Sequence, residues 1–184
     1  MEDTITIAVL AGTTRAKRES VKAALYIADF ARHLDGVEVI FVDPADFDFP
    51  GDGNDPEGKD PRYTDIVKRA DAFFVVTPEY NHSFPGSLKR MLDSELELYN
   101  HKPVAFAGVS SGSWGGVRAV ESLLTAVRET GLVALSWDVY FPFVQDKFTD
   151  EGTIKEEHRE RYEHGLTKLF TELLLFAKLL KTIR

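Results

Sequence analysis

A cluster of polar residues follows an apolar segment near the middle of the chain. The apolar run Phe73–Thr77 is typical of a buried strand, because β-branched and aromatic residues dominate it. The polar loop Pro78–Ser83 follows, and its proline should end the strand because proline has no N–H to donate to a sheet. The amide of Asn81 and the ring of Tyr80 offer hydrogen bonds and a stacking surface. These groups suit a flat heterocyclic ligand.

A second polar loop, Gly12–Ser20, follows the apolar run Thr4–Ala11 and reads GTTRAKRES. Backbone N–H groups and the positive end of the helix that begins here favour an anion. Arg15 and the neighbouring hydroxyls add directed hydrogen bonds, each worth roughly 1.5–3 kcal/mol when one partner is charged. This chemistry suits a phosphate monoester. The alternative is a hydrophilic loop whose charges are only solvated.

A third loop, Ser110–Gly116, reads SSGSWGG and follows the apolar run Pro103–Val109. Its glycines allow the backbone to approach a ligand closely. We expect Trp114 to pack against the protein rather than to bind a ligand.

Alternating strands and helices place these loops in a common architecture. The hydrophobic pattern predicts strands over 4–11, 37–42, 73–77, 103–109 and 132–141, and helices over 20–33, 63–70, 87–99, 117–129 and 153–183. Such alternation produces a parallel sheet with helices on both faces. We predict one α/β domain over residues 1–184, with five parallel strands in the order 2-1-3-4-5. Because the carboxyl ends of parallel strands share one edge, the three loops should meet there.

The stretch Ala45–Arg62 is rich in Pro, Gly and Asp, which oppose both helix and strand. It is either a solvated acidic surface loop or an arm that covers the site or an interface, since long loops in compact domains are often functional.

Composition limits the function classes. The 184 residues are 43% hydrophobic and 28% charged, as in an ordinary globular protein. The net charge of −8 argues against nucleic acid or an anionic membrane as a partner. The absence of Cys excludes disulfides, thiolate nucleophiles and Cys-ligated metals. We expect no metal site. We also expect a cytoplasmic protein, because the N-terminus lacks a signal-peptide pattern and no segment is long enough to span a bilayer.

Together the three loops resemble the NADPH-dependent FMN reductase family, a flavodoxin-like group that includes quinone, azo and chromate reductases. The resemblance rests on GTTRAKRES, on PEYNHSFPGSLKRMLD and on SSGSWGGVRA, and it covers nearly the whole chain. It implies a flavodoxin-like three-layer sandwich with tightly bound FMN. Many members carry a shorter G-S-x-R-x-x-S loop, so Arg18 is expected to share the phosphate role here. The implied cofactor-binding residues are Thr13, Arg15, Arg18 and Ser20 for the phosphate, Pro78, Glu79, Tyr80 and Asn81 along the isoalloxazine ring, and Ser111, Gly112 and Gly115 on its other side.

The resemblance further implies an oxidoreductase in which NADPH or NADH reduces FMN, which then reduces a quinone, flavin, azo compound or metal oxyanion. The flavin carries the chemistry, so no side chain is expected to be catalytic. A ping-pong mechanism and a homodimer or homotetramer are expected. Two alternatives remain: a flavodoxin-type electron carrier, whose phosphate loop would usually read T/S-x-T-G-x-T without an arginine, and a flavin-dependent regulatory protein.

Overall fold

The computed structural model describes residues 4–184, and its centre is a parallel sheet of five strands. The strands are β1 (Ile5–Ala11), β2 (Val37–Val42), β3 (Ala72–Pro78), β4 (Pro103–Val109) and β5 (Val133–Phe141), and their order is β2-β1-β3-β4-β5. This is the predicted order, with the reversal between β1 and β3. Every residue of β1, β3 and β4 is buried, which explains their continuous apolar sequences.

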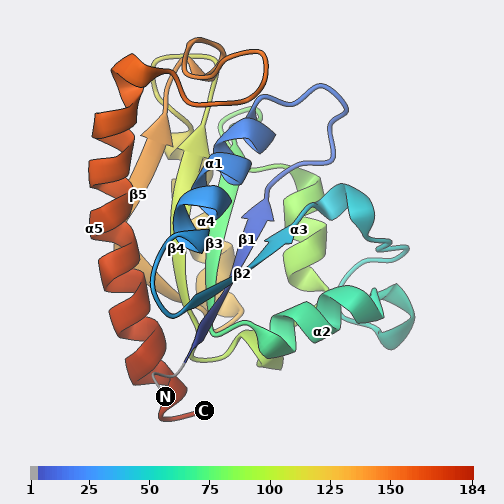
Figure 1. The fold of residues 1–184 in the computed structure, drawn as a ribbon. Coiled ribbons are helices and arrows are strands. Elements are labelled where there is room, and N and C mark those ends of the chain that lie inside the picture. The colour runs from blue at the N-terminus through green and yellow to red at the C-terminus, as the bar shows by residue number, and fades with distance from the viewer. Residues whose placement is uncertain (1–3) are drawn as a thin grey trace.

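Helices cover both faces of the sheet (Figure 1). Helices α1 (Ser20–Arg32) and α5 (Glu156–Lys181) pack on one face, and α2 (Pro61–Arg69), α3 (Gly86–Asp93) and α4 (Val117–Glu129) pack on the other. Each face has its own hydrophobic cluster, because alternate residues of every central strand point to opposite sides. The result is the three-layer arrangement expected from the sequence.

Helix α3 is shorter than predicted and ends at Asp93 rather than at Tyr99. The hydroxyl of Ser94 donates to the carbonyl oxygen of Met91 at 2.7 Å and so caps the end of the helix. Beyond it, the buried hydroxyl of Tyr99 lies 2.7 Å from that of Tyr63 on α2. Burial of Tyr99 therefore draws the chain out of the helical path, which local periodicity does not reveal.

Other boundaries also differ from the prediction. Strand β3 extends one residue further than predicted and includes Pro78, which lies opposite Val109. Pro78 is the last residue of the strand, so its missing N–H removes no hydrogen bond from the interior of the sheet. Helix α5 begins at Glu156 rather than Thr153, because Phe148 and Ile154 form an antiparallel bridge just before it.

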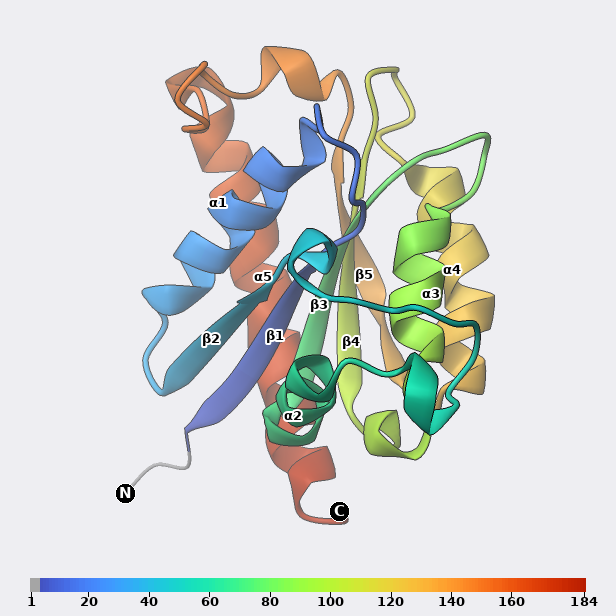
Figure 2. The same cartoon turned by 90° about the vertical axis from the view of Figure 1, so that its right-hand side faces the viewer.

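The long segment 45–62 packs against α2 and α3 (Figure 2). The rings of Phe47 and Phe49 contact Tyr63, at centroid distances of 5.8 and 5.6 Å. Arg90 of α3 donates to the carbonyl oxygens of Gly53 and Gly58. The segment is therefore tied to the helices, although residues 51–57 are exposed.

Asp60 connects this segment to α2. Its carboxylate, 6% exposed, accepts hydrogen bonds from the backbone N–H groups of Arg62 and Asp48, at 3.0 and 2.9 Å. The side chain of Arg62 also donates to it, and mainly this bond lowers the pKa of Asp60 to about 2. Asp60 is therefore both the N-cap of α2 and the anchor of the preceding loop.

We predict that Asp60→Asn lowers the free energy of unfolding by about 1–2 kcal/mol at pH 7. The pKa of Asp60 is lower in the folded state than the value of about 3.9 in an unfolded chain, so the carboxylate stabilises fully above about pH 4. That contribution is lost as the pH falls towards 2, so the difference between wild type and variant should shrink over this window. Urea unfolding at several pH values measures it, with exposed Asp65→Asn as the control; a constant difference would contradict the assignment.

Candidate functional site

Three loops converge at the carboxyl edge of β1, β3 and β4, at the top of Figure 2. A backbone hydrogen bond to the neighbouring strand fixes the start of each loop. The N–H of Gly12 donates to the carbonyl oxygen of Val76 at 2.8 Å, that of Glu79 to Val109 at 3.0 Å, and that of Ser110 to Phe141 at 3.2 Å. The sheet thus brings together the segments that the sequence analysis singled out.

Gly12 is required by the close approach of the first loop to β3. A Cβ atom at this position would lie 2.6 Å from the carbonyl oxygen of Val76 and 2.9 Å from the Cα atom of Thr77. Both neighbours are backbone atoms of a buried strand, so they have little room to move. A side chain at residue 12 would push the first loop away from the second.

The second loop is a tight turn held by reciprocal backbone hydrogen bonds. The N–H of Tyr80 donates to Ser83 at 2.8 Å, and the N–H of Ser83 donates to Tyr80 at 3.0 Å. The central residues Asn81 and His82 have φ values of 51° and 67°, as a type I′ hairpin turn requires. Asparagine tolerates this conformation well, which gives Asn81 a structural reason to occupy the position.

Tyr80 joins the second loop to the first. Its hydroxyl lies 2.9 Å from the hydroxyl of Thr13, which is 2% exposed and also accepts from the N–H of Arg15 at 3.3 Å. Arg18 donates to the carbonyl oxygen of Thr13 and forms an ion pair with Asp43, at the end of β2. Asp43 therefore balances the charge of Arg18, and Thr13 lies inside the loop rather than at its surface.

The remaining charges of the first loop point to an anion site. Among the described residues, Arg15 and Lys17 have no ion-pair partner. Helix α1 begins at Ser20 without a side-chain cap and without an acidic residue in its first turn. The N-cap residue Glu19 makes no side-chain hydrogen bond to these amide groups and pairs with Lys22 at 2.8 Å instead, so the N-terminal amide groups of α1 remain without a side-chain acceptor.

Two adjoining hollows form a groove between the loops. The first, about 380 Å³, is lined by predicted residues Arg15, Arg18, Ser20, Pro78, Glu79, Tyr80 and Ser111, together with Lys17, Glu19, Val109, Ser110, Val144 and Gln145. The second, about 230 Å³, is lined by Asn81 and Gly112 with Glu79, His82, Ser110, Ser111, Trp114 and Arg118. Glu79, Ser110 and Ser111 line both, so we describe them as one groove.

The glycines of the third loop have different roles. A Cβ atom on Gly112 would meet nothing within 4 Å, so this residue leaves open space beside the groove. Gly115, with φ of 63°, faces Tyr140 instead, where a Cβ atom would come within 2.9 Å of the side chain. The loop thus presents Gly112 to the groove, while Gly115 lets it pack against β5.

An ion pair joins the second and third loops. Arg118, in the first turn of α4, donates to a carboxylate oxygen of Glu79 at 3.1 Å. Its guanidinium also lies 4.8 Å from the ring centre of Trp114, a cation–π arrangement. Trp114 was expected to pack against the protein rather than to bind a ligand; its ring packs on Arg118, but it stays 61% exposed and lines the second hollow. The other carboxylate oxygen of Glu79 is buried and has no hydrogen-bond partner among the described residues.

Sequence reasoning did not select Lys17, Arg118, Val144 or Gln145, which line the groove. A signal existed for Arg118, because a cation in the first turn of a helix is unfavourable and needs a compensating carboxylate. Gln145 lies beyond β5 and donates to the carbonyl oxygen of Ser111 at 3.3 Å. Its distance from the other loops in the sequence gave no comparable signal.

The fold and the groove define a flavodoxin-like flavoprotein, and comparison with known sequences identifies the family. The pattern of the family described as NADPH-dependent FMN reductase matches residues 5–146, and the chain belongs to this family. It is therefore an oxidoreductase with FMN as its cofactor and NAD(P)H as its co-substrate.

Reductases are among the relatives of known activity. A quinone reductase of Pseudomonas putida KT2440 is 26% identical over 170 residues, which cover 86% of this chain and 89% of the relative. An NADPH azoreductase of Bacillus sp. OY1-2 is 43% identical over 60 residues, which cover 32% of this chain and 33% of the relative.

Solved structures have the same fold. FerB from Paracoccus denitrificans, a flavoenzyme NAD(P)H:(acceptor) oxidoreductase, has a TM-score of 0.75 at 23% identity, with 97% of this chain and 98% of FerB covered. A flavodoxin of Streptococcus pneumoniae has a TM-score of 0.59 at 20% identity, with 92% and 99% covered. At these identities the similarities establish the fold alone.

A double-mutant cycle tests the ion pair between Glu79 and Arg118. We predict a coupling of about 1 kcal/mol in the free energy of unfolding, since Arg118 is partly exposed and solvent weakens the attraction. Arg118→Met alone should lower the free energy of unfolding by more than the double change Glu79→Gln/Arg118→Met. The reason is that the single change leaves the largely buried carboxylate of Glu79 unpaired. Urea unfolding of all four proteins gives the coupling. Strictly additive effects would mean that the pair contributes nothing.

Proposed function

We propose that the chain is an FMN-dependent NAD(P)H oxidoreductase that reduces quinones, flavins, azo compounds or metal oxyanions. The observation that carries this is the groove itself, with Arg15, Lys17 and the uncapped start of α1 at one end and a hydrogen-bonded turn along its side. Its hollows are of a size that holds a nucleotide-like ligand.

One end of the groove has the residues to bind the phosphate of FMN. Arg15, Ser20 and the amide groups at the start of α1 supply charge and directed donors at one end of the groove. Lys17 adds a second cation. Arg18, already paired with Asp43, holds the loop in shape and faces the phosphate only as part of the groove wall. We therefore assign the main phosphate contact to Arg15.

The isoalloxazine ring would lie between the second and third loops. Pro78, Glu79, Tyr80 and Asn81 form one wall, in which the backbone is fixed by the turn. Ser111 and Gly112 form the other, where Gly112 leaves room for a flat ring. Gly115 supports this wall from behind rather than touching the ligand.

FMN held in the groove would supply two-electron redox chemistry between NAD(P)H and an acceptor. For a quinone the balance is NAD(P)H plus a proton plus quinone, giving NAD(P)⁺ and hydroquinone. The chain binds and orients these partners, and no side chain has to act as a nucleophile. Because the groove is open beside Trp114, both substrates can approach through the same entrance.

An electron carrier or a flavin-dependent regulatory protein is the alternative. The first loop favours the enzyme, since a phosphate site centred on an arginine differs from the hydroxyl-rich loop of flavodoxins. Slow turnover with every acceptor would favour the alternatives.

Arg15→Ala should weaken FMN binding by about 10- to 100-fold, because a charge-assisted contact to the phosphate is lost. Riboflavin, which has no phosphate, should bind with nearly unchanged affinity. Quenching of flavin fluorescence measures both dissociation constants. Arg32→Ala, an exposed cation at the other end of α1, is the matched control. Equal losses for FMN and riboflavin would refute the phosphate assignment.

Steady-state kinetics test the shared entrance. If NAD(P)H and a flat acceptor use the same part of the groove, the nucleotide must leave before the acceptor enters. We predict parallel double-reciprocal lines, competition between acceptor and NAD(P)H at high concentration, and loss of flavin absorbance on adding NADPH without acceptor or oxygen. Intersecting lines with a detectable ternary complex would exclude a shared entrance but not the flavin assignment.

We also propose a homodimer or homotetramer, with α3 and α4 at the interface. These helices flank the flavin-facing loops, so a second subunit would cover part of each groove. Sedimentation velocity of the FMN-bound protein at micromolar concentration should show an oligomer. A monomer with full FMN occupancy would contradict this proposal.

A further inference from the structure

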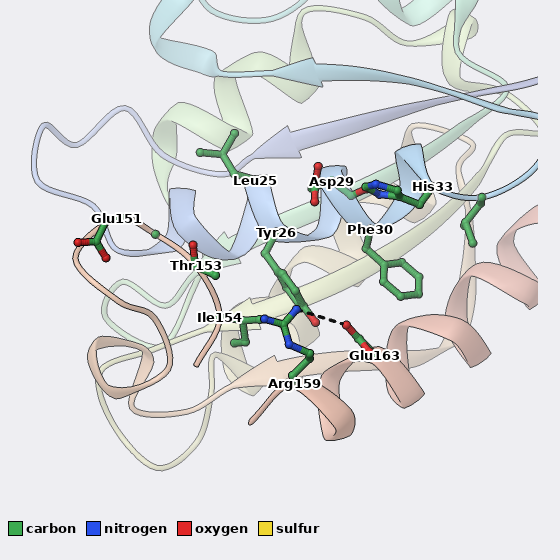
Figure 3. A pocket seen from close by; sticks show the side chains of 12 residues that line it. Leu25, Tyr26, Asp29, Phe30, His33, Glu151, Thr153, Ile154, Arg159 and Glu163 are labelled. Atoms are coloured by element: carbon green, nitrogen blue, oxygen red, sulfur yellow. Dashed lines mark hydrogen bonds and ion pairs between the residues drawn. The ribbon is translucent and has the colours of Figure 1, made fainter. Parts of the chain in front are cut away.

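The surface that selects an electron acceptor must adjoin the groove, because the acceptor has to reach the flavin. A separate hollow of about 640 Å³ lies between α1 and α5 (Figure 3), and none of its lining residues lines the groove. A molecule in that hollow would therefore not touch the residues that hold the flavin. The residues that can select an acceptor are those of the groove itself.

The second hollow of the groove is lined by three residues that we do not assign to FMN, namely His82, Trp114 and Arg118. Trp114 stands out among them, because its side chain is large, apolar and 61% exposed. Single exposed apolar side chains are common on protein surfaces and need no special explanation. Trp114 differs from such residues because its neighbours hold both its ring and its backbone.

The ring of Trp114 is held through one face. The guanidinium carbon of Arg118 lies 4.8 Å from the ring centre, and Arg118 is in turn tied to Glu79 by the ion pair at 3.1 Å. The backbone N–H of Glu79 donates to Val109, the last residue of β4. This series of contacts connects the indole to the sheet, while most of the indole surface stays open to solvent.

The backbone at Trp114 is also held. Its carbonyl oxygen accepts a hydrogen bond from the N–H of Val117 at 3.2 Å, at the start of α4. Gly116, with φ of 90°, lies directly against β4, where a Cβ atom would come within 2.8 Å of the carbonyl carbon of Gly108. The indole is therefore a fixed aromatic surface beside the groove.

Hydrogen-bond donors line the same hollow. The side chains of Asn81 and His82 carry N–H groups, and Gly112 leaves open space beside them. A flat ligand with oxygen atoms at its rim can stack on the indole and accept hydrogen bonds from these donors.

A compact anion finds less in this hollow. The charge of Arg118 is already balanced by Glu79, and a stacking surface offers nothing to a metal oxyanion. The lining therefore favours a quinone over an oxyanion.

We propose that Trp114 determines acceptor specificity, as the surface on which a quinone stacks while it receives electrons from FMN in the groove. The inference rests on the proposed function, because it selects among the acceptors named there. For menadione, a flat naphthoquinone, NADPH and a proton give NADP⁺ and the hydroquinone. For ferricyanide, a compact anion without a flat face, two anions take one electron each and one proton is released per NADPH.

Trp114→Ala should lower kcat/KM for menadione by about 5- to 10-fold, the loss expected for one aromatic stacking contact. For ferricyanide, kcat/KM should change by less than about two-fold, since it has no ring to stack. Trp114→Phe keeps an aromatic ring and should restore most of the activity with menadione.

Trp137→Ala is the matched control. Trp137 is 49% exposed and has the ammonium of Lys168 at 3.1 Å from its ring centre, but it lines neither hollow of the groove. This variant should reduce both acceptors as the wild type does.

A titration without electron transfer tests the contact directly. In FMN-saturated Trp137→Phe, Trp114 is the only tryptophan, so its fluorescence reports on the second hollow. Menadione added without NADPH should quench it saturably, with a dissociation constant below about 1 mM. Trp114→Phe, which retains only Trp137, should show the linear quenching of random collisions.

Three results would overturn the proposal. They are equal losses for menadione and ferricyanide in Trp114→Ala, the absence of saturable quenching, and a ten-fold weaker FMN affinity in Trp114→Ala, which would make Trp114 part of the flavin site. Failure of the proposed function would appear differently, as wild-type protein whose flavin absorbance NADPH does not change. The fluorescence titration needs no NADPH and would still decide whether a quinone lies against Trp114.

Discussion

The groove depends on how closely the end of β1 approaches the end of β3. Gly12 has no side chain, and its N–H donates to Val76 within the sheet. This contact puts Thr13 within hydrogen-bond distance of Tyr80, and so connects the first loop with the second. The start of α1, where we propose that the phosphate binds, and the second loop are therefore positioned by one packing constraint in the sheet.

Charge pairing within the loops decides which groups remain for a ligand. Arg18 forms an ion pair with Asp43, and Arg118 forms one with Glu79, so these two cations stabilise the loops rather than a ligand in the groove. Arg15 and Lys17 lack such partners among the described residues. A phosphate would meet a site whose positive charge is available without first breaking an internal ion pair, which lowers the cost of binding.

The sequence was sufficient for the sheet order, because five apolar runs alternate with helical patterns and parallel connections allow few topologies. It also located the groove, since loops at strand ends must share an edge. It did not reveal which cations are already paired, because Arg18 with Asp43 and Arg118 with Glu79 join segments distant in sequence. The early end of α3 escaped prediction for the same reason, since burial of Tyr99 is a tertiary effect.

Backbone strain is concentrated at the edge that forms the groove. Among the described residues, the non-glycine positions with positive φ are Asn81, His82, Phe143 and His101, and the first three lie in loops at this edge. Each is held by local hydrogen bonds; the N–H of Phe143, for example, donates to Gly112 at 3.1 Å. Such conformations persist only where the surroundings enforce them. The loops are thus fixed before a ligand arrives, and a rigid groove loses less entropy when it binds a flat, rigid ring.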